Sequence, residues 1–293
     1  MGLLSDFGLE DVAVQFARVP MFPIFDLMHY TLSIMYLKHE AGVVDLSRRS
    51  PITCWVCSML CCFGGGMLAA AMLGEPILDP FESNINVFLA SVIWYMVFYF
   101  PKDLYYRLCS LLPVKLFVVA SKEVTRVRKI AAGVAHAHHV YKRGYVVMVA
   151  VGIAKGAGSG LLANLEQLLR GVWKPNTNEL LNMSFPTKAT LLGAVLFTVE
   201  AAGWLPLSEE FLILIVTIFL VTTKVTLTAM HSHASPFDPI ETPLCGFLFG
   251  AAPPDSDGHG HGQSSSGPAA PAQQGKAEPT EPALRKRKSK KAE

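Results

Sequence analysis

Apolar segments alternate with short polar segments from residue 23 to residue 230. Proline, glycine and charged residues gather between them, where helices are expected to end. The pattern predicts seven membrane helices, at about residues 23–37, 52–73, 87–100, 114–134, 145–169, 188–203 and 211–230. We therefore expect an all-α membrane protein with seven transmembrane helices.

The fourth segment differs from the others because it carries a stripe of basic residues. Lys115, Lys122, Arg126 and Lys129 lie at i, i+7, i+11 and i+14, which is one face of a helix. A Lys or Arg at mid-bilayer costs ~2.5–3.5 kcal/mol, so this face cannot lie against lipid. Two interpretations follow: a basic helix on the membrane surface, or a spanning helix that lines an aqueous cavity. The apolar segments on both sides favour the second.

Composition agrees with a membrane protein and excludes an ordinary soluble domain. Apolar residues make up 51% of the chain and charged residues 16%, and the mean hydropathy is +0.37. The first twenty residues carry Asp6, Glu10 and Asp11 and lack the pattern of a cleavable signal peptide. We expect the first membrane segment to direct its own insertion.

Glycines mark the second and the fifth segments, as Gly64-Gly65-Gly66 and as Lys155-Gly156-Ala157-Gly158-Ser159-Gly160. Glycine weakens a helix by about 1 kcal/mol relative to alanine and permits a bend. Small residues also allow membrane helices to pack closely, and both roles can hold together.

The chain divides into two similar halves. The distance from Pro23 to Gly64 is close to that from Pro113 to Gly156. Since three helices form each half, the second copy is inverted, and the expected fold is an inverted 3+3 repeat plus a seventh helix. Such repeats with glycine-interrupted helices place a transport pathway at their interface. The expected parts are a luminal lead-in (1–20), two three-helix repeats (21–110 and 111–207), the seventh helix (208–235) and a mostly disordered basic tail (236–293).

Loop charges orient the chain. Basic residues concentrate in the loops on the side of the tail, and acidic residues in the opposite loops, with Lys142 and Arg143 as the exception. The positive-inside rule then places the N-terminus in the lumen and the C-terminus in the cytosol. Lys290 and Lys291 resemble the dilysine retrieval signal of endoplasmic-reticulum membrane proteins, which must face the cytosol.

Several motifs in order resemble those of the trimeric intracellular cation channels. They cover residues from about 10 to 250, and they are Phe22-Pro-Ile-Phe-Asp26, Cys62-Phe-Gly-Gly-Gly66, Lys122-Glu-Val-Thr-Arg-Val-Arg-Lys-Ile130, Leu168-Leu-Arg-Gly-Val-Trp-Lys-Pro175 and Met183-Ser-Phe-Pro-Thr-Lys188. The resemblance implies a homotrimer of the endoplasmic or sarcoplasmic reticulum membrane with one pore in each subunit. It also implies passage of monovalent cations, chiefly potassium, as counter-ions during calcium release, and hence functional coupling to calcium-release channels.

The resemblance also implies roles for particular residues. Lys122 and Arg126 correspond to contacts of a phosphatidylinositol bisphosphate lipid, and Lys129 to a voltage-sensing or pore residue. The further pore and gating candidates are Gly65, Gly66, Lys155, Gly156 and Gly158, with Gly158 as the bend of the fifth helix. Because bare cations repel potassium, we expect lipid phosphates and Glu123 to neutralise the stripe.

Acidic residues of the luminal loops have two interpretations. Glu75, Asp79 and Glu82 are weak candidates for a regulatory calcium site, and a solvated acidic surface is the ordinary alternative. Glu209 and Glu210 face the same side and, with these residues, could concentrate cations at the pore mouth.

Other functions fit less well. A secondary transporter uses the same inverted repeat and would have its substrate site at the glycine-broken helices. A seven-helix receptor is a poorer fit, because this chain has no receptor signature after the third predicted span. No nucleophile–base pairing, metal-ligand set or phosphate loop is recognisable, so we expect no enzyme, and we expect no nucleic-acid partner.

Overall fold

A computed structural model describes residues 8–174 and 177–230, together with residues 236, 237, 241, 243, 246 and 247. These residues form helices, turns and loops, and no strand occurs among them. Residues 1–241 make up one compact unit and residues 242–293 a second one. The fold described below is that of the first unit. Lys290 and Lys291 lie outside the described residues.

Each of the seven predicted segments coincides with a helix. The long helices are α2 (Ile24–His39), α4 (Pro51–Leu73), α5 (Asn84–Tyr99), α7 (Leu112–Tyr141), α8 (Tyr145–Leu161) with α9 (Ala163–Leu169), α10 (Phe185–Ala201) and α11 (Glu209–Ala229). Shorter elements are α1 (Leu9–Arg18), α3 (Val43–Arg49), α6 (Leu104–Ser110) and the 3₁₀ turns η2 (Asp79–Phe81) and η3 (Pro101–Asp103). The predicted segments are therefore confirmed as helical, the fifth as two helices, whereas the count of seven membrane helices is not.

The ends of the helices follow local sequence signals. Ser83 and Ser208 cap α5 and α11, and each hydroxyl accepts a hydrogen bond from a backbone N–H of the first turn at 3.4 Å. Pro51 occupies the first turn of α4, where its missing N–H costs nothing. Gly74 ends α4 with a φ of 74°, a left-handed conformation that glycine adopts without strain.

The length and composition of some of these helices support a crossing of the membrane. Three stretches are long and apolar enough by themselves: α4, α8 with α9, and α11. A fourth candidate is α5 together with Pro101–Ser110, which meet at 93°. The 16 residues of α2 and 17 of α10 span only about 24–26 Å, less than a ~30 Å hydrocarbon core. The crossing of α2, α7 and α10 thus stays a prediction.

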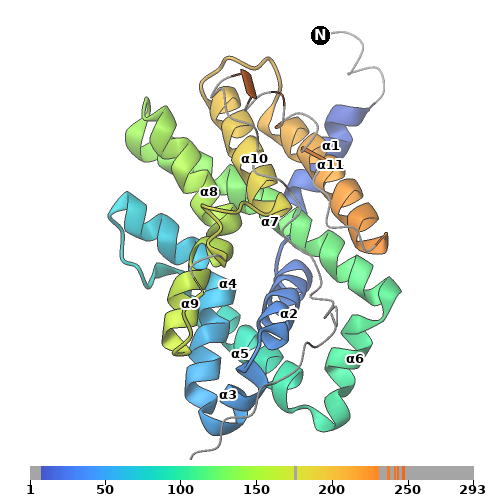
Figure 1. Ribbon diagram of the computed structural model, residues 1–293. Coiled ribbons are helices and arrows are strands. Elements are labelled where there is room, and N and C mark those ends of the chain that lie inside the picture. Colours follow the sequence, from blue (N-terminus) through green and yellow to red (C-terminus); the bar gives the residue numbers. More distant parts are fainter. Residues whose placement is uncertain are drawn as a thin grey trace, which may run out of the picture. The chain divides into compact units, whose positions relative to one another are not determined.

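The helices pack as two groups that meet along α7, α8 and α4. One buried core comes from α2, α4 and α5 and includes Ile34 and Val97. The other comes from α7, α8, α10 and α11 and includes Met148 and Phe197. In Figure 1, α7 runs between these groups, with α2 on one side and α8, α10 and α11 on the other, and all four of these helices contact it.

The glycines allow α4 and α8 to touch backbone to backbone. A Cβ atom on Gly158 would lie 2.4 Å from Gly65 Cα, and a Cβ on Gly65 would lie 2.7 Å from the Lys155 carbonyl oxygen. Neither distance is compatible with a side chain, so these positions require glycine.

The expectation of glycine-broken helices is wrong in one respect. Helix α4 runs without interruption through Gly64, Gly65 and Gly66. In the fifth segment, the interruption lies at Leu162 between α8 and α9 and not at Gly158. Close packing against the facing helix stabilises the helical conformation there, which offsets the low helix propensity of glycine.

Candidate functional site

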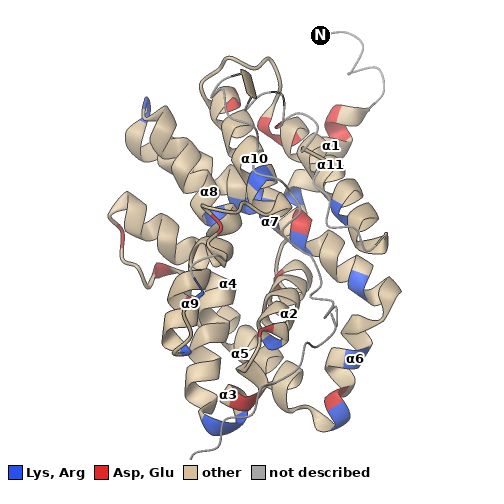
Figure 2. Cartoon of the chain, viewed as in Figure 1, with Lys and Arg blue, Asp and Glu red and all other residues tan. Residues whose placement is uncertain are grey.

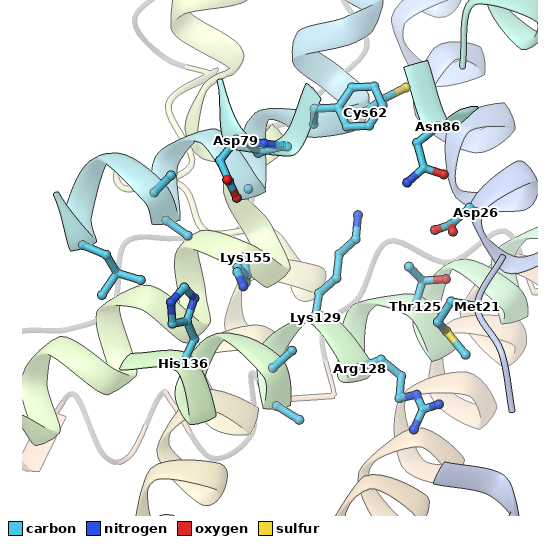
Figure 3. A pocket seen from close by; sticks show the side chains of 18 of the residues that line it. Met21, Asp26, Cys62, Asp79, Asn86, Thr125, Arg128, Lys129, His136 and Lys155 are labelled. Carbon is cyan, nitrogen blue, oxygen red and sulfur yellow. The ribbon is translucent and has the colours of Figure 1, made fainter. Parts of the chain in front are cut away.

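A large cavity opens between α2, α4, α7, α8 and the start of α11. It has a volume of about 600 Å³, and we call it the outer cavity. Figure 3 shows Asp26, Asp79, Lys129, His136 and Lys155 around it. Charged side chains of both signs therefore face a space large enough for several hydrated ions.

A narrow neck follows on from the outer cavity. Its volume is about 20 Å³, which is room for about one water molecule. Its lining residues are His29, Cys61, Cys62, Gly65, Lys122, Arg126, Lys129, Lys155, Gly156, Gly158 and Ser159. The neck thus lies where α4 and α8 cross and where the basic stripe of α7 faces them.

A third space, the inner cavity, lies beyond the neck. It has a volume of about 270 Å³, and Tyr36, Glu40, Glu166 and Glu179 are among the residues that line it. Neighbouring spaces share lining residues and are therefore adjacent. Cys62, Lys129 and Lys155 line both the outer cavity and the neck, and Cys61, Lys122 and Ser159 line both the neck and the inner cavity. The three spaces therefore lie in series, and the side chains that line two of them stand between neighbouring spaces.

The basic stripe of α7 sits at this closure, as predicted for a helix that lines a cavity. Figure 2 shows Lys and Arg in the middle of the chain along α7, while most other charges lie at helix ends and in loops. Lys122, Arg126 and Lys129 line the neck, whereas Lys115 lies outside all three cavities. The surface-helix alternative does not fit, because Lys122 is buried with 8% of its surface exposed.

Each basic residue has a different partner. Arg126 donates to both oxygens of Glu123 at 2.8 and 3.4 Å and to the Gly156 carbonyl at 2.8 Å. Lys122 donates to the Ser33 hydroxyl at 3.1 Å and lies 5.0 Å from the Tyr36 ring centre.

Glu123 has a side chain only 3% exposed, so it neutralises Arg126 within the protein. Among the described residues, no carboxylate lies within ion-pair distance of Lys122, Lys129 or Lys155. The neck therefore keeps excess positive charge.

Arg128 points away from the neck, although it belongs to the same motif. Its guanidinium donates to the carbonyl oxygens of Ala17 and Val19, the latter at 2.9 Å. These carbonyls lie at the end of α1 and have no helical partners beyond it. Arg128 therefore fastens α1 to α7.

The predicted pore residues are brought together, with small differences. Gly65, Lys155, Gly156 and Gly158 line the neck, and Gly66 lines the outer cavity. A Cβ on Gly66 would lie 2.7 Å from Pro80 Cγ, so Gly66 seats η2 against α4.

The acidic loop residues form no compact ligand set. Glu75 and Asp79 line the outer cavity, but Glu82 is exposed and does not. Glu75 lies 2.8 Å from His136. No group of three or more potential metal ligands occurs within residues 8–174 and 177–230.

Sequence reasoning missed the roles of His29, Asp26 and Glu179. His29 Nε2 lies 2.9 Å from Lys129 Nζ in the neck. Asp26 points into the outer cavity (Figure 3). Glu179 accepts from the backbone N–H and the hydroxyl of Ser184 at the start of α10. The signal available for the first two was a pair of polar residues three positions apart in an apolar segment.

Comparisons with known proteins agree with this geometry. The profile of the TRIC channel family matches residues 40–231. The chain belongs to the TRIC channel family. The human trimeric intracellular cation channel type A is 56% identical over 252 residues, which are 86% of this chain and 84% of the human protein. Type A is also the subtype suggested by the Arg-Val-Arg-Lys form of the basic motif and by the sequence Ala-His-Ala-His-His at residues 135–139.

Solved structures of the family share the fold. One, described as the structural basis for activity of TRIC counter-ion channels in calcium release, is 49% identical, with a TM-score of 0.74. It covers 76% of this chain and 100% of its own. A Caenorhabditis elegans channel with bound Ca²⁺ is 41% identical, with a TM-score of 0.71, and covers 78% of this chain and 100% of its own. The all-helical TRIC fold is thus shown, and the homologues of this chain are channels and not enzymes.

Proposed function

We propose that each subunit of this TRIC family member conducts monovalent cations, chiefly potassium, along the path formed by the outer cavity, the neck and the inner cavity. The observation that carries the proposal is the arrangement of the three spaces in series, with lining residues shared between neighbours. A static pocket for a small ligand would need only one of them. The described conformation corresponds to a closed channel, since the neck holds about one water molecule.

Positive charge at the neck supplies the gate. A potassium ion 4 Å from an ammonium group is repelled by about 4 kcal/mol at an effective dielectric constant of 20. Lys129 and Lys155 both border the neck and the outer cavity, so opening requires these charges to move away or to be neutralised. Moving one charge through the membrane field is worth ~2.3 kcal/mol per 100 mV, which supports voltage as a gating stimulus acting on Lys129.

Phosphoinositide lipid is the proposed regulator on the inner side. Lys122 has one hydrogen-bond partner among the described residues, Ser33, so its ammonium has donors left for a phosphate. Arg126 is already engaged by Glu123 and Gly156, so its guanidinium has fewer donors left for a phosphate than Lys122 has. Lys122→Ala with Arg126→Ala should weaken binding of phosphatidylinositol bisphosphate in vesicles, and normal binding would contradict the assignment.

The inverted 3+3 repeat plus a seventh helix is proposed as the membrane topology. Each half would contribute one glycine-bearing helix, α4 or α8, and the crossing of these two at Gly65 and Gly158 supports the symmetry. In this topology α2 and α10 are short spans and α7 is a charged span facing the path. The outer cavity faces the lumen and the inner cavity faces the cytosol, in line with the positive-inside rule.

The wider physiology is proposed from the family. We infer a homotrimer in the membrane of the endoplasmic or sarcoplasmic reticulum that passes counter-ions while calcium-release channels are open. Luminal calcium is a candidate regulator through Glu75 and Asp79, which line the outer cavity. Replacing both by neutral amides should then reduce the calcium response, and an unaltered response would remove them from the sensor.

Planar-bilayer recording of the purified protein under a potassium chloride gradient tests the function. Unitary currents that reverse near the potassium equilibrium potential are expected. The alternative is a secondary transporter with its substrate site at the crossing of α4 and α8, since a single narrow site between two vestibules also fits alternating access. Silence in the presence of phosphoinositide, with saturable tracer uptake, would favour that alternative.

A further inference from the structure

His29 joins three helices at the neck. It lies on α2, and its Nε2 atom is 2.9 Å from Lys129 Nζ on α7 and 3.2 Å from the carbonyl oxygen of Cys62 on α4. The imidazole is buried, with 8% of the residue exposed. Its contact with Lys129 is the one hydrogen bond that holds this ammonium among the described residues.

One ring nitrogen cannot serve both neighbours at once. If Nε2 carries a hydrogen it donates to Cys62 and has no lone pair for Lys129, whose ammonium only donates. If Nε2 is bare, it accepts from Lys129. Since α4 is continuous through Cys62, that carbonyl already has its helical partner four residues on. We therefore assign Nε2 as the acceptor of the hydrogen bond from Lys129. The neutral imidazole then carries its hydrogen on Nδ1.

The charges around His29 require it to be a neutral acceptor. The charged and titratable groups that line the neck with it are Lys122, Arg126 and Lys129 of α7, Lys155 of α8, and Cys61 and Cys62 of α4. On its own helix the Tyr30 ring packs against it, and Asp26 faces the outer cavity. Of these cationic side chains, Arg126 alone forms an ion pair with a carboxylate of the described residues, that of Glu123. An imidazolium would add a further positive charge to a space of about 20 Å³.

We propose that His29 is the positioning residue of the gate: its neutral imidazole accepts a hydrogen bond from Lys129 and holds that ammonium in the neck. This inference rests on the cation path of the proposed function. Asp26 lies one turn before His29 on α2, and its carboxylate faces the outer cavity together with Lys129 (Figure 3). Asp26 thus offers the ammonium a second partner on the outer side once it leaves His29, and the open state exchanges one for the other.

The test is the voltage dependence of open probability in planar bilayers of defined lipid, measured in potassium chloride. His29→Leu removes the acceptor at similar volume. At a voltage where the wild type is mostly closed, open probability should rise about ten-fold, the change expected from loss of one hydrogen bond to a charged group. His29→Gln, which places an amide oxygen near the position of Nε2, should restore most of the wild-type behaviour.

A double-mutant cycle with Lys129→Gln separates positioning from a general structural effect. Because His29 acts through Lys129, adding His29→Leu to Lys129→Gln should change nothing further. The proposal is overturned if His29→Leu shifts open probability equally in the wild type and in Lys129→Gln. It is also overturned if His29→Leu alone gates like the wild type. If His29→Leu does not assemble, His29→Met takes its place in the cycle.

A matched control lies on the same helix. His39 bonds the Tyr106 hydroxyl at 2.7 Å, outside the three cavities, so His39→Leu should gate like the wild type. Absence of unitary cation currents in the wild type would reject the channel function itself. Normal wild-type currents with an unchanged His29→Leu would reject only the role of His29.

Discussion

Replacing Gly158 by alanine should force apart the two helices that form the neck. The added Cβ would lie 2.4 Å from Gly65 Cα and 3.0 Å from Gly65 N. Ordinary contact needs 3.4 Å or more, so α4 and α8 must separate by about 1 Å. The obstacle is backbone, which cannot rotate away as a side chain can, and overpacking of this kind costs about 1–3 kcal/mol.

Gly193→Ala provides the matched control. Gly193 is also inside a long helix, α10, but the nearest atom to its added Cβ is Ile130 Cδ1 at 3.4 Å. Alanine there should gain up to about 1 kcal/mol of helix propensity with no clash. The two substitutions have the same chemistry and differ only in the space available.

Thermal unfolding of the purified protein in detergent, monitored as loss of the folded protein on size exclusion, measures the difference in stability. The clash of about 1–3 kcal/mol, at about 2–4 °C per kcal/mol, should make Gly158→Ala melt about 2–12 °C below Gly193→Ala. It should also widen the neck and raise open probability in the fraction that remains folded. If both variants melt together, the close backbone contact does not exist and the crossing of α4 and α8 at these glycines is wrong.

Three further substitutions test the charges. Glu123→Gln leaves the Arg126 guanidinium buried without its carboxylate, so we expect a loss of about 3 kcal/mol in unfolding free energy, partly recovered when Arg126→Gln is added; a single variant as stable as the wild type would contradict this. Lys129→Gln removes a charge worth ~2.3 kcal/mol per 100 mV, so the slope of open probability against voltage should flatten, and an unchanged slope counts against Lys129 as a sensor. Glu75→Gln breaks the half-exposed pair with His136 and should lower the unfolding free energy by less than about 1 kcal/mol. Its conductance should fall below that of the wild type at low salt, where screening is weakest. A variant that conducts like the wild type at both low and high salt would exclude a role of Glu75 in concentrating cations.

Much of the helical fold was predictable from the sequence because its signals are local. Apolar runs, capping serines and prolines act within a few residues, and each predicted segment lies on a helix. The basic face of α7 was also predictable, since helical periodicity alone aligns Lys122, Arg126 and Lys129. Their position at a cavity followed from the cost of placing these charges against lipid.

The glycines mark where this local reasoning ends. The same residue type favours a bend or close packing, and the sequence does not distinguish the two. Only the packing of α4 on α8 decided that Gly65 and Gly158 meet while α4 stays continuous, and that the fifth segment breaks at Leu162.

The identity of each charge's partner was likewise a tertiary result. By itself the sequence determined a membrane-type, all-helical chain with a positive helix face that must avoid lipid. The contacts of His29 with Lys129, of Arg126 with Gly156 and of Arg128 with the end of α1 join residues that are 30 to 111 positions apart. Helical periodicity relates only residues within a few turns of each other, so it does not predict contacts over such separations in the sequence. Burial of charge with a suitable partner is decided only when the helices pack, because desolvation and hydrogen-bond geometry depend on atoms from several helices at once.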